Sequence, residues 1–310
     1  MTKRGFRMEQ NNTIDMPRLQ WYPGHMRKAE RLVQENLKLV DVVVELLDAR
    51  IPMSSANPVL REIVAGKPRL VVLNKSDLAE PAATRAWVQY FASQDIVAVP
   101  VDAVKGAGTK ELVQAIQKLA APRTEKLAKH GAKPRAARCM ILGIPNVGKS
   151  SLINRLSGDA RTKVENRPGV TRAKQWIRIG AQLELLDMPG ILWPKFEDAR
   201  AALRLAFTGA ISDTVYDVGG VVLQLLRVLH ADYPAALRER YDLAANLPTG
   251  VELLEEIGRR RGCLVRGGRI DYEKAEQIVL TDFRSGRLGR VTLDSPIQAE
   301  TTDTSSDCIR

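Results

Sequence analysis

The segment GIPNVGKS, residues 143–150, places two glycines, a lysine and a serine at the spacing G-x-x-x-x-G-K-[ST]. The glycines permit a tight backbone turn whose amides can face a phosphate, and an apolar strand pattern before it and a helix pattern after it supply the required context. Lys149 would neutralise phosphate oxygens, and Ser150 would bind Mg²⁺. A glycine turn without a ligand is the alternative. The expected phosphate-binding residues are Asn146, Val147, Gly148, Lys149, Ser150 and Ser151.

Two later segments could complete a metal site beside this loop. Asp187 ends the apolar run of LELLDMPG, where a nucleotide site holds a water of its Mg²⁺, and Gly190 offers a backbone amide to a γ-phosphate. Thr171, in RPGVTR, would close on the metal when that phosphate is present, or it is an ordinary loop threonine. Mg²⁺ is therefore the expected cofactor, bound by Ser150, Thr171 and, through water, Asp187.

The segment NKSD, residues 74–77, has the residue types that recognise guanine. The carboxylate of Asp77 can accept both adjacent donors of guanine, whereas adenine has no donor at its N1 and would leave a buried carboxylate unpaired. Asn74 would brace the pocket against the phosphate loop, and the stem of Lys75 would cover the ring. The alternative is a helix N-cap after a strand. Asp102 and Ala103, in VPVDA after the next strand, would give the second base contact.

The residue that usually orients the attacking water is absent, because Ile191 follows Gly190 where many GTPases have glutamine. His25, in WYPGHM, is the candidate catalytic group, since imidazole exchanges protons near neutral pH. The alternative is a packed or helix-capping histidine beside Trp21 and Tyr22.

The surrounding sequence alternates helix and strand patterns up to about residue 197. This alternation predicts an α/β domain, with a mostly parallel sheet covered by helices on both faces. Residues 121–137 contain two prolines and are expected to form a surface connection or a frayed helix end. The predicted organisation is a flexible segment at 1–17, the nucleotide domain at 18–197, a smaller all-helical domain at 198–293 and a disordered tail at 294–310.

The base motif precedes the phosphate loop, the reverse of the usual GTPase order. Joining the ends of a GTPase sheet and opening the chain ahead of the base-reading strand gives the order found here. The sequence therefore predicts a circularly permuted P-loop GTPase domain, whose metal-binding switch at Asp187 leads into the helical domain.

The charge of the chain indicates a polyanionic partner. Lysine and arginine number 47 against 36 aspartate and glutamate residues, a net charge of +11. Arginines cluster with glycines in GRRRGCLVRGGR, which is either an RNA-binding surface or a solvated face. The candidate RNA-binding residues are Arg259, Arg260, Arg261, Arg266 and Arg269.

Targeting and redox signals are few. No uninterrupted apolar run is long enough to span a bilayer, and the start has no secretory signal, so we expect a cytoplasmic protein that does not bind membranes. Cys139, Cys263 and Cys308 include no C-x-x-C pair, which favours free thiols.

The chain resembles the circularly permuted GTPases in WYPGHMRKA, DARIPMSSANP, LNKSDL, GIPNVGKSSLINRL, RPGVTR and DMPG. This resemblance implies a protein that binds GTP and GDP and hydrolyses GTP in late maturation of the large (50S) ribosomal subunit; we expect a monomer. The resemblance further implies that the helical domain contacts rRNA, that His25 is catalytic, and that Asn146 binds K⁺ in potassium-stimulated members. Asp102 departs from the serine usual there, and Asn146 could instead only stabilise its loop. A metabolic NTPase without an RNA partner and a GTP-regulated signalling adaptor remain alternatives.

Overall fold

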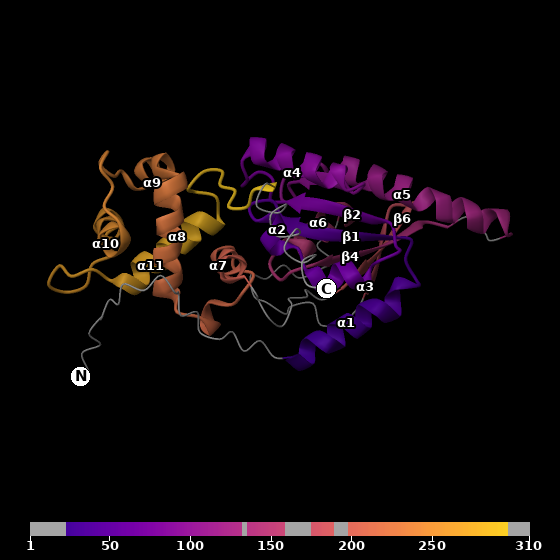
Figure 1. The fold of residues 1–310 in the computed structure, drawn as a ribbon, viewed down its shortest axis with the longest axis horizontal. Coiled ribbons are helices and arrows are strands. Elements are labelled where there is room, and N and C mark those ends of the chain that lie inside the picture. The colour runs from indigo at the N-terminus through magenta and orange to yellow at the C-terminus, as the bar shows by residue number, and fades with distance from the viewer. Residues whose placement is uncertain (1–22, 132–134, 159–174, 189–197, 297–310) are drawn as a thin grey trace, which may run out of the picture.

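The computed structural model describes residues 23–131, 135–158, 175–188 and 198–296, and the side chains from residue 30 onward within the first range. An α/β domain and a helical domain lie at opposite ends of the long axis, with helix α7 between them (Figure 1). None of the described helices is both long and apolar enough to cross a bilayer.

The α/β domain is built on a six-stranded sheet in the order β3-β2-β1-β4-β6-β5. All neighbouring strands are parallel except β5, which runs antiparallel to β6. The strands are β1 (Val42–Asp48), β2 (Arg69–Asn74), β3 (Val97–Val101), β4 (Ala137–Gly143), β5 (Gln175–Ile179) and β6 (Leu183–Asp187). Every residue of β1 is buried, as expected for a central strand with helices on both faces.

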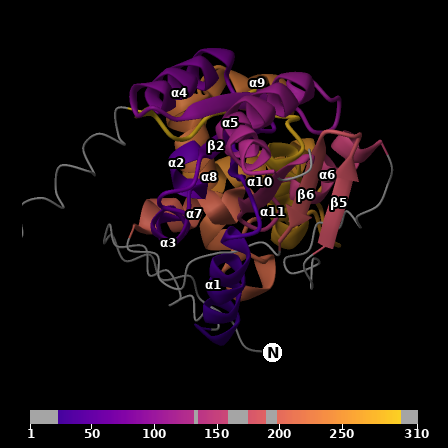
Figure 2. The same cartoon turned by 90° about the vertical axis from the view of Figure 1, so that its right-hand side faces the viewer.

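Helices cover both faces of this sheet, as the sequence predicted (Figure 2). One face packs on α5 (Thr109–Lys129) and α6 (Lys149–Ser157). The other packs on α1 (Pro23–Leu37), α3 (Pro58–Ile63) and α4 (Pro81–Ser93), and the short α2 (Pro52–Ser55) follows β1. The permuted α/β architecture is therefore confirmed.

Helix α5 is longer than the sequence indicated. It continues through Pro122 to Lys129, across half of the segment expected to be a connection or a frayed end. Arg123 attaches this extension to the domain, because its Nη1 donates to the Val40 carbonyl at 2.7 Å and its Nε lies 3.2 Å from the Asp41 carboxylate. This tertiary contact offsets the backbone hydrogen bond that proline cannot make.

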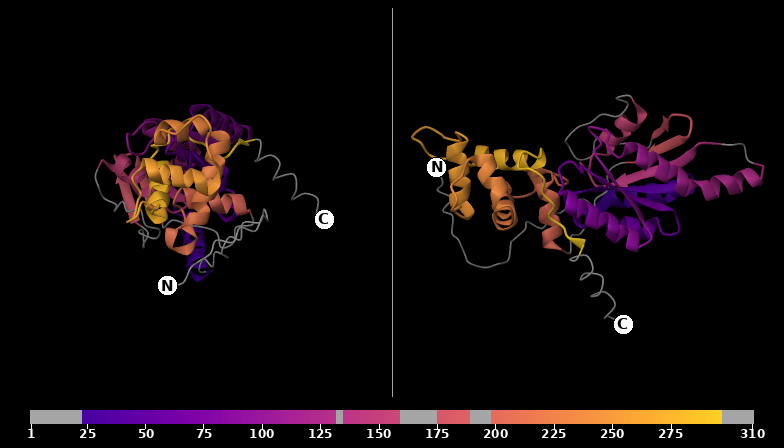
Figure 3. Two further views of the ribbon diagram at one scale, coloured as in Figure 1. Left: turned by 90° about the vertical axis from the view of Figure 1, so that its left-hand side faces the viewer. Right: turned by 90° about the horizontal axis from the view of Figure 1, so that it is seen from above.

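The helical domain surrounds α8 (Val218–Asp232), whose residues Val222, Leu225, Leu226 and Leu229 are fully buried. Its other elements are α7 (Ala199–Phe207), the 3₁₀ helix η1 (Asp213–Val215), α9 (Pro234–Tyr241), α10 (Gly250–Arg260) and α11 (Tyr272–Arg284) (Figure 3). Its only strand pairing among the described residues is the single bridge between Leu264 and Ile270.

The chain returns to the α/β domain after α11. The Leu293 amide donates to the Arg50 carbonyl at 2.7 Å. The Asp294 carboxylate accepts from the backbone amide and the hydroxyl of Ser54, at 2.7 and 3.0 Å, and pairs with Arg204 of α7 at 2.7 Å. Asp294 is only 5% exposed, so the disordered tail expected from residue 294 begins too early; residues 297–310 lie outside the described part. The polar sequence around Asp294 gave no indication of its distant partners, Ser54 and Arg204.

Replacing Asp294 with alanine should lower the free energy of unfolding by about 2–4 kcal/mol, because it removes the acceptor of the buried Ser54 amide and a buried ion pair with Arg204. Urea denaturation of the two proteins measures the difference. Glu35→Ala removes another carboxylate–arginine pair, Arg31–Glu35, but on an exposed helix face, and should cost no more than about 0.5 kcal/mol. Equal effects of the two substitutions would contradict the assigned role of Asp294.

Candidate nucleotide-binding site

The predicted site residues come from strands whose carboxyl ends meet at one edge of the sheet. The register pairs Asp48 with Asn74, Asn74 with Val101, and Ile141 with Asp187. Loops that follow these strands therefore converge, at the position where open parallel sheets bind ligands.

The phosphate loop joins β4 to α6, and its glycines are required by close backbone approaches. Gly148 has φ +96°, and a Cβ there would lie 2.2 Å from Nδ2 of Asn74. A Cβ at Gly143 would lie 2.8 Å from the Leu46 carbonyl oxygen. Helix α6 begins at Lys149, so the backbone amides of the loop lie directly before a helix N-terminus. Such an arrangement favours the binding of an anion.

Lys149 and Asp187 form a buried pair at the centre of this edge. Their Nζ and Oδ1 atoms are 3.2 Å apart, and Nζ also donates to the Met188 carbonyl. Burial lowers the pKa of the Lys149 ammonium, while the Asp187 charge acts in the opposite direction. A phosphate beside Lys149 would further favour the ammonium form.

The described residues also fit a bound Mg²⁺. The Asp187 carboxylate is buried, and its Oδ1 has no hydrogen-bond donor among the described residues apart from the ion pair with Lys149. Ser150 lies in the first turn of α6. Carboxylate and hydroxyl oxygens are the ligands Mg²⁺ prefers. Thr171 and Gly190 lie outside the described residues.

Asn74 links the base side of the site to the phosphate side. Its Nδ2 donates to the Val147 carbonyl at 2.8 Å, and its Oδ1 accepts from the Ala103 amide at 3.2 Å. Both amide atoms of this buried side chain are thus used to join three loops. This is the bracing contact the sequence led us to expect.

Lys75 is held by a network that the sequence did not reveal. Its Nζ donates to the Asn146 carbonyl at 2.8 Å and to Asp48 Oδ2 at 2.9 Å, while Arg50 makes a two-pronged contact with Asp48 at 2.9 and 2.8 Å. Burial alone would raise the pKa of Asp48, but the adjacent Arg50 and Lys75 hold it well below its usual range. The sequence feature that could have indicated a role for Asp48 in the site is its position at the end of an apolar strand, which Asp187 shares.

Asp102, predicted to take part in the second base contact, also stabilises the backbone of its own turn. Its Oδ1 accepts from the amides of Val104 and Lys105, at 2.8 and 2.9 Å, and closes the turn after β3. The side chain is 3% exposed, although it borders the pocket. Asp77, the carboxylate predicted to recognise the base, lines the same pocket.

One pocket of about 600 Å³ is lined both by residues predicted to bind the base and by residues predicted to bind the phosphates. This volume is typical of a small-molecule site. The predicted residues that line it are Asn74, Lys75, Asp77, Asp102, Ala103, Asn146, Gly148 and Ser151. His25 belongs to the first turns of α1, and its side chain lies outside the described residues.

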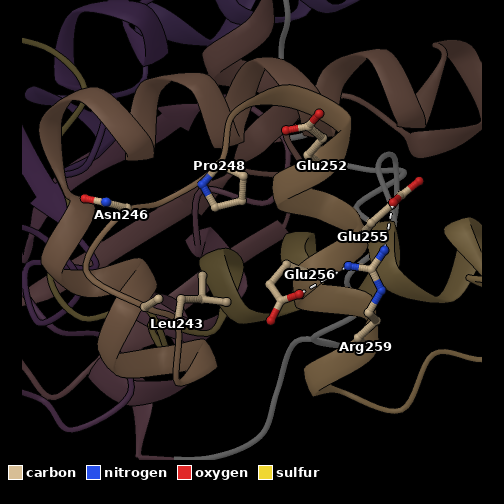
Figure 4. Close-up of a pocket in the computed structure, with 8 residues that line it drawn as sticks. Leu243, Asn246, Pro248, Glu252, Glu255, Glu256 and Arg259 are labelled. Carbon is tan, nitrogen blue, oxygen red and sulfur yellow. Dashed lines mark hydrogen bonds and ion pairs between the residues drawn. The ribbon is translucent and has the colours of Figure 1, made fainter.

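The structure divides the predicted arginine cluster. Arg259 pairs with Glu255 and Glu256 at 3.0 and 3.2 Å, beside an acidic hollow (Figure 4). Arg260 pairs with Glu256 and Asp242, both at 3.1 Å.

The other three arginines differ from this pair. Arg261 lies over the Tyr241 ring, 5.3 Å from its centroid. Arg266 and Arg269 are exposed in the loop between α10 and α11, and neither pairs with an acidic residue in the described part of the chain. Of the five predicted arginines, Arg266 and Arg269 are therefore the most accessible to a polyanion.

Comparisons with known proteins agree with this geometry. A family model described as 50S ribosome-binding GTPase matches residues 138–240. The chain is 50% identical over 278 residues to Ribosome biogenesis GTPase A of Bacillus cereus, covering 90% of this chain and 94% of that protein. It is 34% identical over 298 residues to Mitochondrial ribosome-associated GTPase 1 of Mus musculus, covering 89% and 90% respectively. The solved structure of GDP-bound TM YlqF has a TM-score of 0.58 at 26% identity, covering 86% of this chain and 99% of that one.

Proposed function

The chain belongs to the ribosome biogenesis GTPase A family and is a GTPase, and we propose that it uses GTP hydrolysis to act on the large (50S) ribosomal subunit during late assembly. The observation that carries this proposal is a pocket lined by the phosphate loop, by the NKSD segment and by a helical domain that bears an arginine-containing loop. The nucleotide state would thereby control how the helical domain binds RNA.

Folded RNA is the polyanion that fits this loop. Guanidinium groups contact phosphates in pairs of hydrogen bonds, and Arg266 and Arg269 are exposed to do so. Aromatic residues make up only 5% of the chain, which disfavours stacking on unpaired bases. Contacts with the backbone of structured rRNA therefore fit better.

The catalytic assignments are part of the same proposal. Ser150 and Asp187 would hold Mg²⁺, which when bound neutralises charge that develops on the phosphate oxygens. Asn146 would support a K⁺ ion with a similar effect, and GTPase rates in K⁺ and Na⁺ test this. His25 would orient the attacking water. The resemblance supports this role, and Ile191, at the position after Gly190 where many GTPases have glutamine, is aliphatic and cannot orient water.

Replacing Arg266 and Arg269 together with alanine should weaken binding to purified large subunits. The dependence of log affinity on log salt should become shallower by about one unit for each phosphate that the variant no longer neutralises. Co-sedimentation at several salt concentrations measures both quantities, and GTP affinity should not change. A metabolic NTPase without an RNA partner would not sediment with subunits at all.

The matched control is Arg259→Ala with Arg260→Ala, which removes the same number of charges from side chains already paired with glutamates and aspartate. This control should retain most of the subunit binding. If the Arg266 and Arg269 variant bound subunits like the parent at every salt concentration, the loop would be excluded from the RNA surface.

A further inference from the structure

The nucleotide pocket is not built by the α/β domain alone. One of its walls comes from the end of α7, from η1 and from the end of α11. The wall residues that matter here are Thr208, Gly209, Asp213, Thr281, Arg284 and Ser285. The helical domain is therefore structurally part of the site that binds the nucleotide.

The phosphate loop contacts this wall directly. Nδ2 of Asn146 donates to the Gly209 carbonyl at 2.7 Å, just beyond the end of α7. Gly209 has φ +76°, and a Cβ there would lie 3.2 Å from Nε of Arg284. The backbone at Gly209 thus lies between Asn146 and Arg284.

Arg284 holds the end of α7 in this position. Its Nε donates to the Phe207 carbonyl at 3.0 Å and its Nη2 to the Ala206 carbonyl at 2.9 Å. Asp213 pairs with the same guanidinium through contacts of 2.9 and 2.7 Å. One side chain of α11 therefore binds two carbonyls at the end of α7, of which the Ala206 carbonyl also accepts from the Gly209 amide at 3.1 Å.

The base motif is attached to the same end of α11. A Cβ at Gly286, which has φ +76°, would lie 2.5 Å from Cδ2 of Leu78, so these two segments are in close contact. The Val291 amide donates to the Leu78 carbonyl at 3.0 Å. Leu78 directly follows Asp77, the residue assigned to guanine.

We propose that Arg284 is a positioning residue of the nucleotide site, which fixes Gly209 against Asn146 and so couples guanine-nucleotide affinity to the docking of the helical domain. This coupling rests on the proposed nucleotide site alone and does not require a ribosomal partner. Because coupling between two ligands is reciprocal, a partner that displaces α7 or α11 would change nucleotide affinity by the same factor as nucleotide changes partner affinity.

Arg284→Ala tests the proposal through titration with a fluorescent GDP analogue. We expect affinity to fall about tenfold, within the range usual for coupled sites. Arg284→Lys keeps the charge but cannot reproduce all the contacts of the guanidinium, so the GDP affinity of this variant should lie between those of the parent and the alanine variant.

The matched control is Arg240→Ala. Arg240 also makes a two-pronged contact with a carboxylate of α11, Asp282, at 2.8 and 2.9 Å, but it does not line the pocket. This variant should lose comparable thermal stability while keeping the parent affinity for GDP.

The outcomes separate positioning from general stabilisation. Parent affinity in a folded Arg284→Ala variant would overturn the proposal, as would an equal loss in Arg240→Ala. If Arg284→Ala does not fold, Arg284→Lys gives the answer: weakened GDP binding supports the coupling, and parent affinity refutes it. Large-subunit binding plays no part in these measurements, so failure of the assembly function would leave them interpretable.

Discussion

Replacing Asp77 with asparagine is expected to lower GTP affinity by roughly 10²- to 10³-fold and to improve binding of xanthosine triphosphate. The carboxylate accepts two donors of guanine, and an amide can accept only one while presenting a donor of its own. Xanthine has an oxygen where guanine has its exocyclic amine, and the asparagine amide can donate to it. Nucleotide titration of the parent and variant with both triphosphates measures the change.

Asp102→Asn is the control for this substitution. Asp102 uses its Oδ1 to accept from two turn amides, which an asparagine oxygen can also do. The preference of the Asp102→Asn variant for guanine nucleotides should therefore remain close to that of the parent. An Asp77→Asn variant that still preferred GTP would show that the base is recognised elsewhere.

Replacing His25 with alanine is expected to leave GTP binding nearly unchanged but to slow hydrolysis by roughly 10²- to 10⁴-fold, the contribution typical of a positioned acid–base group. Ile191 cannot orient water, so loss of the imidazole would remove the polar group assigned to this task. Single-turnover hydrolysis on saturating large subunits is the appropriate measurement, because a catalytic approach can become ordered only in the active complex.

His130→Ala is the matched control for His25. His130 is exposed just after α5, and its Nδ1 lies 2.7 Å from the Lys126 carbonyl, within the same helical turn. Its removal should leave the rate unchanged. If His25→Ala turned over at the parent rate on saturating subunits, a ribosomal group would be the better candidate for water activation.

The features readable from the sequence are those with a local cause. Strands β1, β2 and β4 are mostly apolar because helices cover both faces of the sheet. The phosphate loop is recognisable because Gly148 must adopt a positive φ beside Asn74. The permuted order needs only the relative positions of such motifs along the chain.

The features that the sequence did not reveal depend on partners far away in the chain. Asp294 is polar and near the end, yet it is buried against Ser54, 240 residues earlier. In the sequence Arg259 resembles an RNA-binding residue, but in α10 it pairs with glutamates that lie one turn earlier in the helix. Arg284 belongs to a basic stretch of the sequence, and its place in the pocket wall follows from how α11 packs against α7. No local periodicity encodes such contacts.

Control of this GTPase by large ribosomal subunits is the central expectation. The most direct test measures single-turnover GTP hydrolysis by the parent protein alone, with purified small subunits and with increasing amounts of purified large subunits, at fixed Mg²⁺ and K⁺. We expect a saturable rise in rate with large subunits only, because the helical domain proposed to bind them also forms a wall of the nucleotide pocket. The same rate under all three conditions would contradict this expectation.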